Sequence, residues 1–149
     1  MAWLLVLLAA AALVACGSAE HPLDEACLES PRAIERALAR APAPVTLAGG
    51  TRLSECVANA RSDSDLQNAG TVLTRAADDL AEGAAGGDAV AALRLGYLVG
   101  ATRRGARKTA GIHAELQRRI ERAAAHLDEA GGRVAAAVGR GLRAGEATG

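Results

Sequence analysis

Apolar residues recur at spacings of three and four along most of the chain after residue 22, which is the period of an α-helix. The longest regular stretch starts near Ser64, which forms a capping-box pattern with Gln67, and it runs to about Glu82. One face of this stretch carries Leu66, Ala69, Leu73, Ala76, Ala77 and Leu80. The pattern predicts a long amphipathic helix in the middle of the chain.

Shorter helices are expected before this one. Ser30 is a favourable N-cap and Pro31 suits the first helical position, so a helix is predicted to begin there. It ends near Arg40 because two prolines follow within the loop of residues 41–50. Residues 23–28 are predicted to form one or two helical turns, and residues 52–60 a short helix.

The next predicted helix is apolar on almost every side. It follows the N-cap candidate Asp88, and from Val90 to Ala101 its only charged residue is Arg94. Apolar positions all round a helix indicate that it is central and buried. Small residues at four-residue steps form a groove along it that would let a second helix pack closely: Ala92, Gly96 and Gly100.

Two further helices are expected after Gly111. The first carries an apolar stripe of Ile112, Leu116, Ile120, Ala124 and Leu127. The last follows a pair of glycines and carries Val134, Val138 and Leu142. Glycines also occur inside it at 139, 141 and 145, and they predict fraying because each costs up to about 1 kcal/mol in a helix interior.

No stretch of useful length alternates between apolar and polar residues as a strand does. The predicted fold class is therefore all-α, an irregular bundle of five or six helices. Residues 22–149 are long enough to bury a modest core and are expected to form a single helical domain.

The N-terminus carries a different kind of apolar segment. No charged or strongly polar side chain occurs from Ala2 to Ala15, yet a helix of this length would reach only about 21 Å, against about 30 Å for a bilayer core. The length of the run and its small-residue exit suit a cleaved signal peptide. We expect this segment to be removed before the domain folds.

The four residues Leu13-Val14-Ala15-Cys16 resemble the lipobox of bacterial lipoproteins. The resemblance implies that residues 1–15 are a lipoprotein signal peptide and that Cys16 is the first mature residue, carrying two or three acyl chains. Residues 16–21 would then be a short tether to the extracytoplasmic face of a membrane in the cell envelope, because two or more chains anchor stably. An ordinary secretory signal cut nearby and a buried N-terminal helix are the alternatives.

The three cysteines of the chain are an odd number for an exported protein. If Cys16 is acylated, Cys27 and Cys56 remain as a pair in an oxidising compartment, where a disulfide can persist. A metal or redox site is the alternative, but neither cysteine lies in a C-x-x-C motif. We therefore predict a structural disulfide that joins the bundle close to its membrane anchor.

Charge is unevenly distributed, although seventeen Lys plus Arg balance seventeen Asp plus Glu. Residues 16–88 hold twelve acids and six bases, whereas residues 89–149 hold eleven bases and five acids. This overall balance gives no argument for binding nucleic acid. A candidate interaction face for anionic headgroups or an acidic partner contains Arg103, Arg104, Arg107 and Lys108. The alternative, which we favour, is that the two halves pack together and that their charges pair or stay solvated.

No catalytic, metal or nucleotide motif is predicted, and no cofactor is expected. The run GATRRGARKT from Gly100 to Thr109 lacks the lysine that a phosphate-binding loop needs directly after its second glycine. Two of the three histidines, His113 and His126, are expected to be partly exposed helix residues. Tyr97 is expected to be a core residue with its hydroxyl at the rim of the core.

These patterns favour a non-enzymatic binding or structural module, with the membrane and another envelope protein as its partners. The alternative is an envelope hydrolase or a small-ligand-binding bundle whose site is assembled from distant residues. Such a site could pair His113 with an acid from the helical face of Asp78, Asp79 and Glu82. The other interpretation of that acidic face, which we favour, is a solvated surface.

Overall fold

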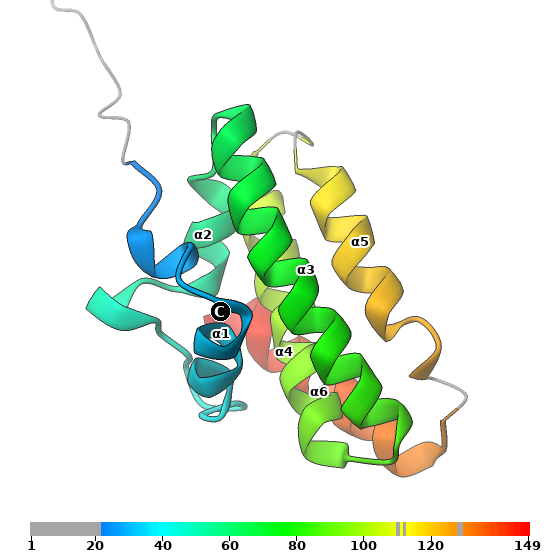
Figure 1. Cartoon of the computed structure of the whole chain (residues 1–149). Coiled ribbons are helices and arrows are strands. Elements are labelled where there is room, and N and C mark those ends of the chain that lie inside the picture. Colours follow the sequence, from blue (N-terminus) through cyan, green and yellow to red (C-terminus); the bar gives the residue numbers. More distant parts are fainter. Residues whose placement is uncertain (1–21, 110, 112, 128–129) are drawn as a thin grey trace, which may run out of the picture.

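A computed structural model describes residues 22–109, 111, 113–127 and 130–149, and these residues contain helices and no strands (Figure 1). The all-α prediction is therefore confirmed, at the upper end of the predicted number of helices. The six α-helices are α1 (Pro31–Leu38), α2 (Leu53–Ala58), α3 (Asp63–Ala85), α4 (Ala89–Ala106), α5 (Ala114–Ala124) and α6 (Gly132–Thr148). Two short 3₁₀ turns, η1 (Glu25–Cys27) and η2 (Ala48–Gly50), lie near α1 and α2 in the sequence.

Two of the three N-caps that the sequence suggested are confirmed. Ser30 caps α1, and Asp88 caps α4 by accepting hydrogen bonds from two backbone amides. The predicted start of α3 was wrong by two residues, because its N-cap is Ser62 and not Ser64. The Ser62 hydroxyl accepts a hydrogen bond from the backbone amide of Asp65 at 3.0 Å. Both serines satisfy the N-cap preference, and the earlier one adds two residues, Asp63 and Ser64, to the helix.

Helix α4 is the centre of the bundle, as its apolar sides predicted. Helices α2, α3, α5 and α6 each pack against it, and α3 and α6 lie on different sides of it (Figure 1). Its fully buried side chains include Leu95, Tyr97 and Leu98. Helix α4 is therefore in contact with each of the other five α-helices.

The contact between α4 and α6 is made through glycines on both helices. A Cβ atom added at Gly96 or Gly100 of α4 would overlap the backbone of α6, as the predicted small-residue groove requires. A Cβ added at Gly141 or Gly145 of α6 would likewise overlap the backbone of α4, at the carbonyls of Leu93 and Tyr97. The predicted fraying of the last helix was therefore wrong, since the glycines that weaken α6 locally are those that let it pack.

The predicted disulfide between Cys27 and Cys56 is present. It joins η1 to α2 with a Cα–Cα distance of 5.5 Å, and both cysteines are fully buried. The loop that it closes spans 29 residues and includes α1 and η2. In the chain-entropy model, closing a loop of this length stabilises the fold by roughly 3.5 kcal/mol.

Tyr97 connects three segments of the core. Its hydroxyl accepts a hydrogen bond from the backbone amide of Val45 at 3.0 Å and lies 3.0 Å from the hydroxyl of Thr148. The side chain is fully buried, so the expectation that its hydroxyl lies at the rim was wrong. The loop before η2 and the C-terminal turn of α6 supply the polar partners that let the hydroxyl enter the core.

Candidate functional site

The predicted lipobox, Leu13 to Cys16, and the tether of residues 16–21 lie outside the residues that the structure describes. The nearest described residues belong to the segment that leads into η1, next to the Cys27–Cys56 disulfide. None of the described helices combines the length and the apolar character needed to cross a bilayer.

The predicted basic face lies at the end of α4, and most of it contacts neighbouring helices. Arg103 forms ion pairs with Glu121 of α5 at 2.6 Å and with Glu146 of α6 at 3.6 Å. Arg107 also lies 3.8 Å from Glu146, and Arg104 donates hydrogen bonds to the backbone carbonyls of Glu146 and Ala147. Lys108 is exposed and has no carboxylate within 4.0 Å among the described residues.

These contacts give the arginines at the end of α4 a structural role. Arg103 holds α5 and α6 to α4 through one guanidinium group. Arg104 binds the last carbonyls of α6, which have no partner within their own helix and carry the negative end of its dipole. The charge that remains free for an external partner is consequently smaller than the sequence of this segment suggests.

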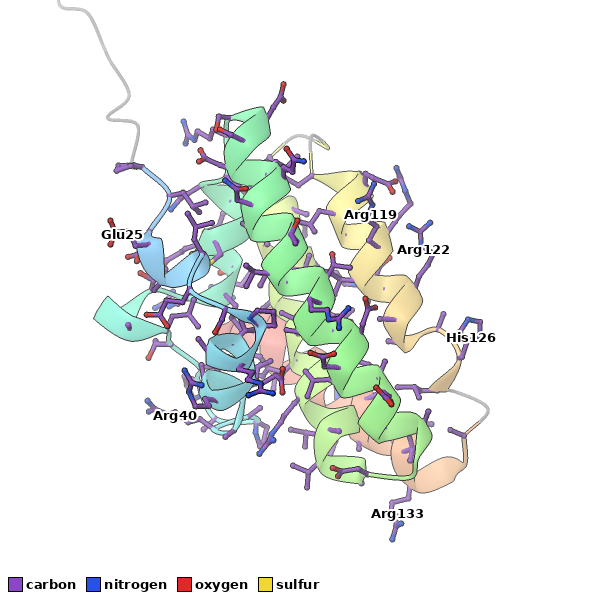
Figure 2. The ribbon with its side chains drawn as sticks, viewed as in Figure 1. Glu25, Arg40, Arg119, Arg122, His126 and Arg133 are labelled. Carbon is purple, nitrogen blue, oxygen red and sulfur yellow. A yellow bond between two sulfur atoms is a disulfide. The ribbon has the colours of Figure 1, made fainter. Side chains whose placement is uncertain are left out.

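His113 is buried, with 2% of its surface exposed, so the expectation of a partly exposed histidine was wrong. Its Nε2 lies 2.6 Å from the backbone carbonyl of Ala60, just before α3. Its Nδ1 has no hydrogen-bond partner among the described residues. The structure does not bring His113 together with a carboxylate of Asp78, Asp79 or Glu82, as the hydrolase alternative would require. His126 is exposed, in the turn after α5 (Figure 2).

A groove with a volume of about 650 Å³ lies between α3 and α5. Leu66, Gly70 and Leu116 provide its apolar part. Gly70 is important for the shape, because an added Cβ there would lie 3.5 Å from the Leu116 side chain and would take up part of the space. Its polar lining comes from both helices: Asp63, Gln67, Thr71, Thr74, Arg75, Asp78, Glu115 and Arg119.

Three of the five charged residues that line the groove, Arg75, Glu115 and Arg119, form ion pairs within their own helices. Arg75 lies 3.6 Å from Asp79 on α3, while on α5 Glu115 contacts Arg119 and Arg118, each at 3.0 Å. Hydrogen bonds from Arg119 and then Arg118 lower the pKa of Glu115 below its ordinary value. Arg119 and its neighbour Arg122 extend from the outer side of α5 (Figure 2).

Neutral polar groups of the groove are free to bind. The side-chain amide of Gln67 and the hydroxyl of Thr74 make no hydrogen bond to any other described residue, and Gln67 is exposed. The groove thus offers hydrogen-bond donors and acceptors above a short apolar floor. That combination suits a polar chain segment or a small polar molecule.

The sequence did not predict this groove. Its two walls are about forty residues apart in the sequence, and nothing in either helix indicates that they are neighbours. One local signal was present, since Gln67, Gly70, Thr71 and Thr74 form a small and uncharged polar stripe on an otherwise charged helical face. Within the described part of the chain, no group of three His, Cys, Asp or Glu is placed to hold a metal ion.

Comparison with known proteins identifies no relative, because no family model, no curated protein and no solved structure matches this chain.

Proposed function

We propose that this chain is a lipid-anchored protein of the bacterial cell envelope, attached through Cys16, and that its helical domain is a non-enzymatic module that binds another envelope protein. The anchor is supported by the lipobox resemblance and by the cysteine count. Cys27 and Cys56 are joined to each other, so Cys16 is the cysteine left for a lipid. A buried disulfide of this kind persists in the oxidising compartments outside the cytoplasm.

The binding role rests on the groove between α3 and α5. It has a volume of about 650 Å³, and it is lined by unpaired polar groups of Gln67 and Thr74. A polar segment of a partner protein could replace the water on these groups and cover the apolar floor at Leu66 and Leu116. The acidic and basic pairs at its sides would then select a partner by its charge pattern.

The anchor is tested by isolating the protein from membranes and determining its N-terminal peptide by mass spectrometry. The expected peptide begins at Cys16 and carries a diacylglyceryl group with or without a further acyl chain. Cys16→Ser should abolish both the lipid modification and the cleavage, so that the chain accumulates as an unlipidated precursor that retains residues 1–15. The matched control, Cys27→Ser with Cys56→Ser, removes the other two cysteines and should leave the lipid in place. Unchanged processing and membrane retention of Cys16→Ser would refute the anchor.

The groove is tested by placing a photo-crosslinking residue at Thr74 in the anchored protein in cells. The control position is Ala39, an exposed residue at the end of α1. We expect one adduct of defined mass from Thr74 and none of that mass from Ala39. Gly70→Leu, which fills the groove, should remove the adduct while the protein stays folded. An adduct that persists in Gly70→Leu, or that forms equally from Ala39, would contradict binding in the groove.

A further inference from the structure

Positive and negative charge are separated in space on opposite sides of α4. Helix α3 contains five carboxylates and a single base, Arg75. Helix α6 contains three arginines and a single acid, Glu146. In Figure 1, α3 lies in front of α4 and α6 lies behind it, and each of them packs against α4. An acidic helix and a basic helix thus pack against different sides of α4.

The three arginines of α6 form a single exposed stripe. Arg133, Arg140 and Arg143 are spaced by seven and three residues, so they share one helical face and span about 15 Å along the axis. All three are exposed, and so is Ala136 between them. The opposite face of α6, with Gly141 and Gly145, is buried against α4. The close glycine contact thus fixes the direction in which the arginines point.

No described carboxylate lies within 4.0 Å of the three arginines of this stripe, which is also true of Arg32 and Arg36 on α1. On α5, three arginines surround Glu115, and at the end of α4 the arginines bind Glu121 and Glu146. The only acid of α6, Glu146, is engaged by Arg103 and Arg107. Helix α6 therefore carries three exposed arginines without an ion pair to a described residue on one face.

We propose that this face, consisting of Arg133, Arg140 and Arg143, binds the anionic headgroups of a phospholipid membrane. Guanidinium groups bind phosphate oxygens in a bidentate manner, and three of them spread over about 15 Å can contact several headgroups at once. Between the arginines the surface is formed by small residues such as Ala136 and Gly139. A surface of this kind lies flat on a membrane, whereas a protein partner needs large apolar or aromatic anchors, which are absent from the described residues of this face.

The proposed lipid anchor would keep the domain near a membrane. The tether of residues 16–21 could reach about 20 Å at most, so the domain would stay within that distance of the headgroups. This proximity rests on the proposed function, but the headgroup binding itself does not, because it requires only the arginines.

The test uses the full chain with Cys16→Ser, which cannot be lipidated, and measures its binding to phosphatidylcholine vesicles with and without phosphatidylglycerol. The apolar residues 1–15 carry no charged side chain and contribute similarly in both cases, so the ratio of the two affinities is the relevant quantity. Two triple variants are compared in this background. The stripe variant is Arg133→Gln, Arg140→Gln and Arg143→Gln. The scattered control is Arg32→Gln, Arg118→Gln and Arg122→Gln, which removes the same charge from exposed positions on α1 and α5.

The unmodified stripe should give preferential binding to the anionic vesicles, and this preference should weaken as salt is raised from about 50 mM to about 500 mM. In the stripe variant, the ratio of the affinities for anionic and neutral vesicles should fall about 100-fold, whereas the scattered control should keep most of this ratio. Thermal unfolding of all three chains should be similar, since exposed Arg→Gln changes are well tolerated in helices.

Three results would overturn the proposal. Equal losses in the two triple variants would show that net charge alone attracts the chain to the vesicles. A preference that does not respond to salt would exclude a headgroup contact of this kind. Absence of any preference for anionic vesicles would direct attention to an acidic protein as the partner of α6. None of these results bears on lipidation of Cys16 or on the groove, which are measured separately.

Discussion

The helix pairs α4–α6 and α3–α5 are built in opposite ways. In α4–α6, glycines on both helices bring the two backbones into contact, and neither helix leaves a hollow at the interface. In α3–α5, the helices contact each other through Leu116 and diverge over a groove of about 650 Å³. Glycine occurs in both pairs, and its role differs completely between them.

The difference separates a scaffold from a surface that can accept a partner. The α4–α6 contact has no space for a substituent and no free polar group, so it can only hold the core together. The α3–α5 groove has both space and free polar groups at Gln67 and Thr74. A small residue is therefore evidence of tight packing only when its surroundings are known.

The largest expected effect on stability is that of Gly141→Ala in α4–α6, which we call the tight pair. The added methyl group would overlap the carbonyl of Leu93, and backbone atoms of α4 cannot move aside as a side chain can. We expect a loss of about 3 kcal/mol in the free energy of unfolding, measured by urea denaturation. The matched control is Gly139→Ala in the same helix, where the added Cβ would lie 3.6 Å from the Arg143 side chain. It should be neutral or stabilising, and equal effects of the two changes would contradict the packing described.

A smaller effect is expected from Tyr97→Phe, which keeps the ring in the core of the tight pair. The backbone amide of Val45 and the hydroxyl of Thr148 would both lose the phenolic oxygen as a partner. Since Val45 is fully buried, its amide would remain unsatisfied, and the free energy of unfolding should fall by about 2 kcal/mol. Thermal unfolding measures this loss. A phenylalanine variant as stable as the original would show that these hydrogen bonds add nothing.

In α3–α5, which we call the open pair, replacing glycine with alanine should change the free energy of unfolding in the opposite direction. Gly70→Ala adds a methyl group that makes an ordinary contact of 3.5 Å with Leu116, and it removes a glycine from the interior of α3. The helix propensity of alanine should raise the free energy of unfolding by about 0.5 to 1 kcal/mol. Urea denaturation checks the sign, which is the opposite of that for Gly141→Ala. Destabilisation by Gly70→Ala would mean that α3 and α5 are as tightly packed as α4 and α6.

The smallest effect concerns the charge at the side of the groove. Hydrogen bonds from Arg119 and Arg118 lower the pKa of Glu115, so this carboxylate supports the folded state above its unfolded pKa. The support is lost as the pH falls through the lowered pKa of the folded state. Arg119→Gln should move the pKa of Glu115 up toward its ordinary value, as followed by carboxyl NMR shifts during an acid titration. No movement would show that Arg119 does not interact with Glu115 in solution.

Much of the tight pair could be predicted from the sequence, but only from one side. Gly96 and Gly100 recur at helical spacing within an apolar stretch, so the groove on α4 was recognisable. Their counterparts Gly141 and Gly145 indicated fraying, because glycine propensity describes an isolated helix and takes no account of the contact that α4 supplies. The disulfide was predicted by assigning Cys16 to a lipid, which leaves only Cys27 and Cys56 to pair.

The groove and the burial of His113 could not be predicted because both depend on residues far apart in the sequence. His113 contacts the carbonyl of Ala60, which is 53 residues away in the sequence. The groove is lined by α3 and α5, and the whole of α4 lies between these two helices in the sequence. The role of Arg103 was hidden for the same reason, since its partners Glu121 and Glu146 belong to two later helices. Local patterns show the charge or the apolar face of a helix and leave its partners undetermined.

Amide hydrogen exchange, followed residue by residue, tests most directly whether α4–α6 is the scaffold and α3–α5 the adaptable face. The account predicts that amides in the middle of α4 and α6 exchange only through global unfolding, with the same free energy in both helices. Amides of α5 should exchange faster, through local opening away from α3, because its buried contacts are limited to a stripe that includes Leu116 and Ile120. Protection in α5 equal to that in α6 would contradict this division of the molecule.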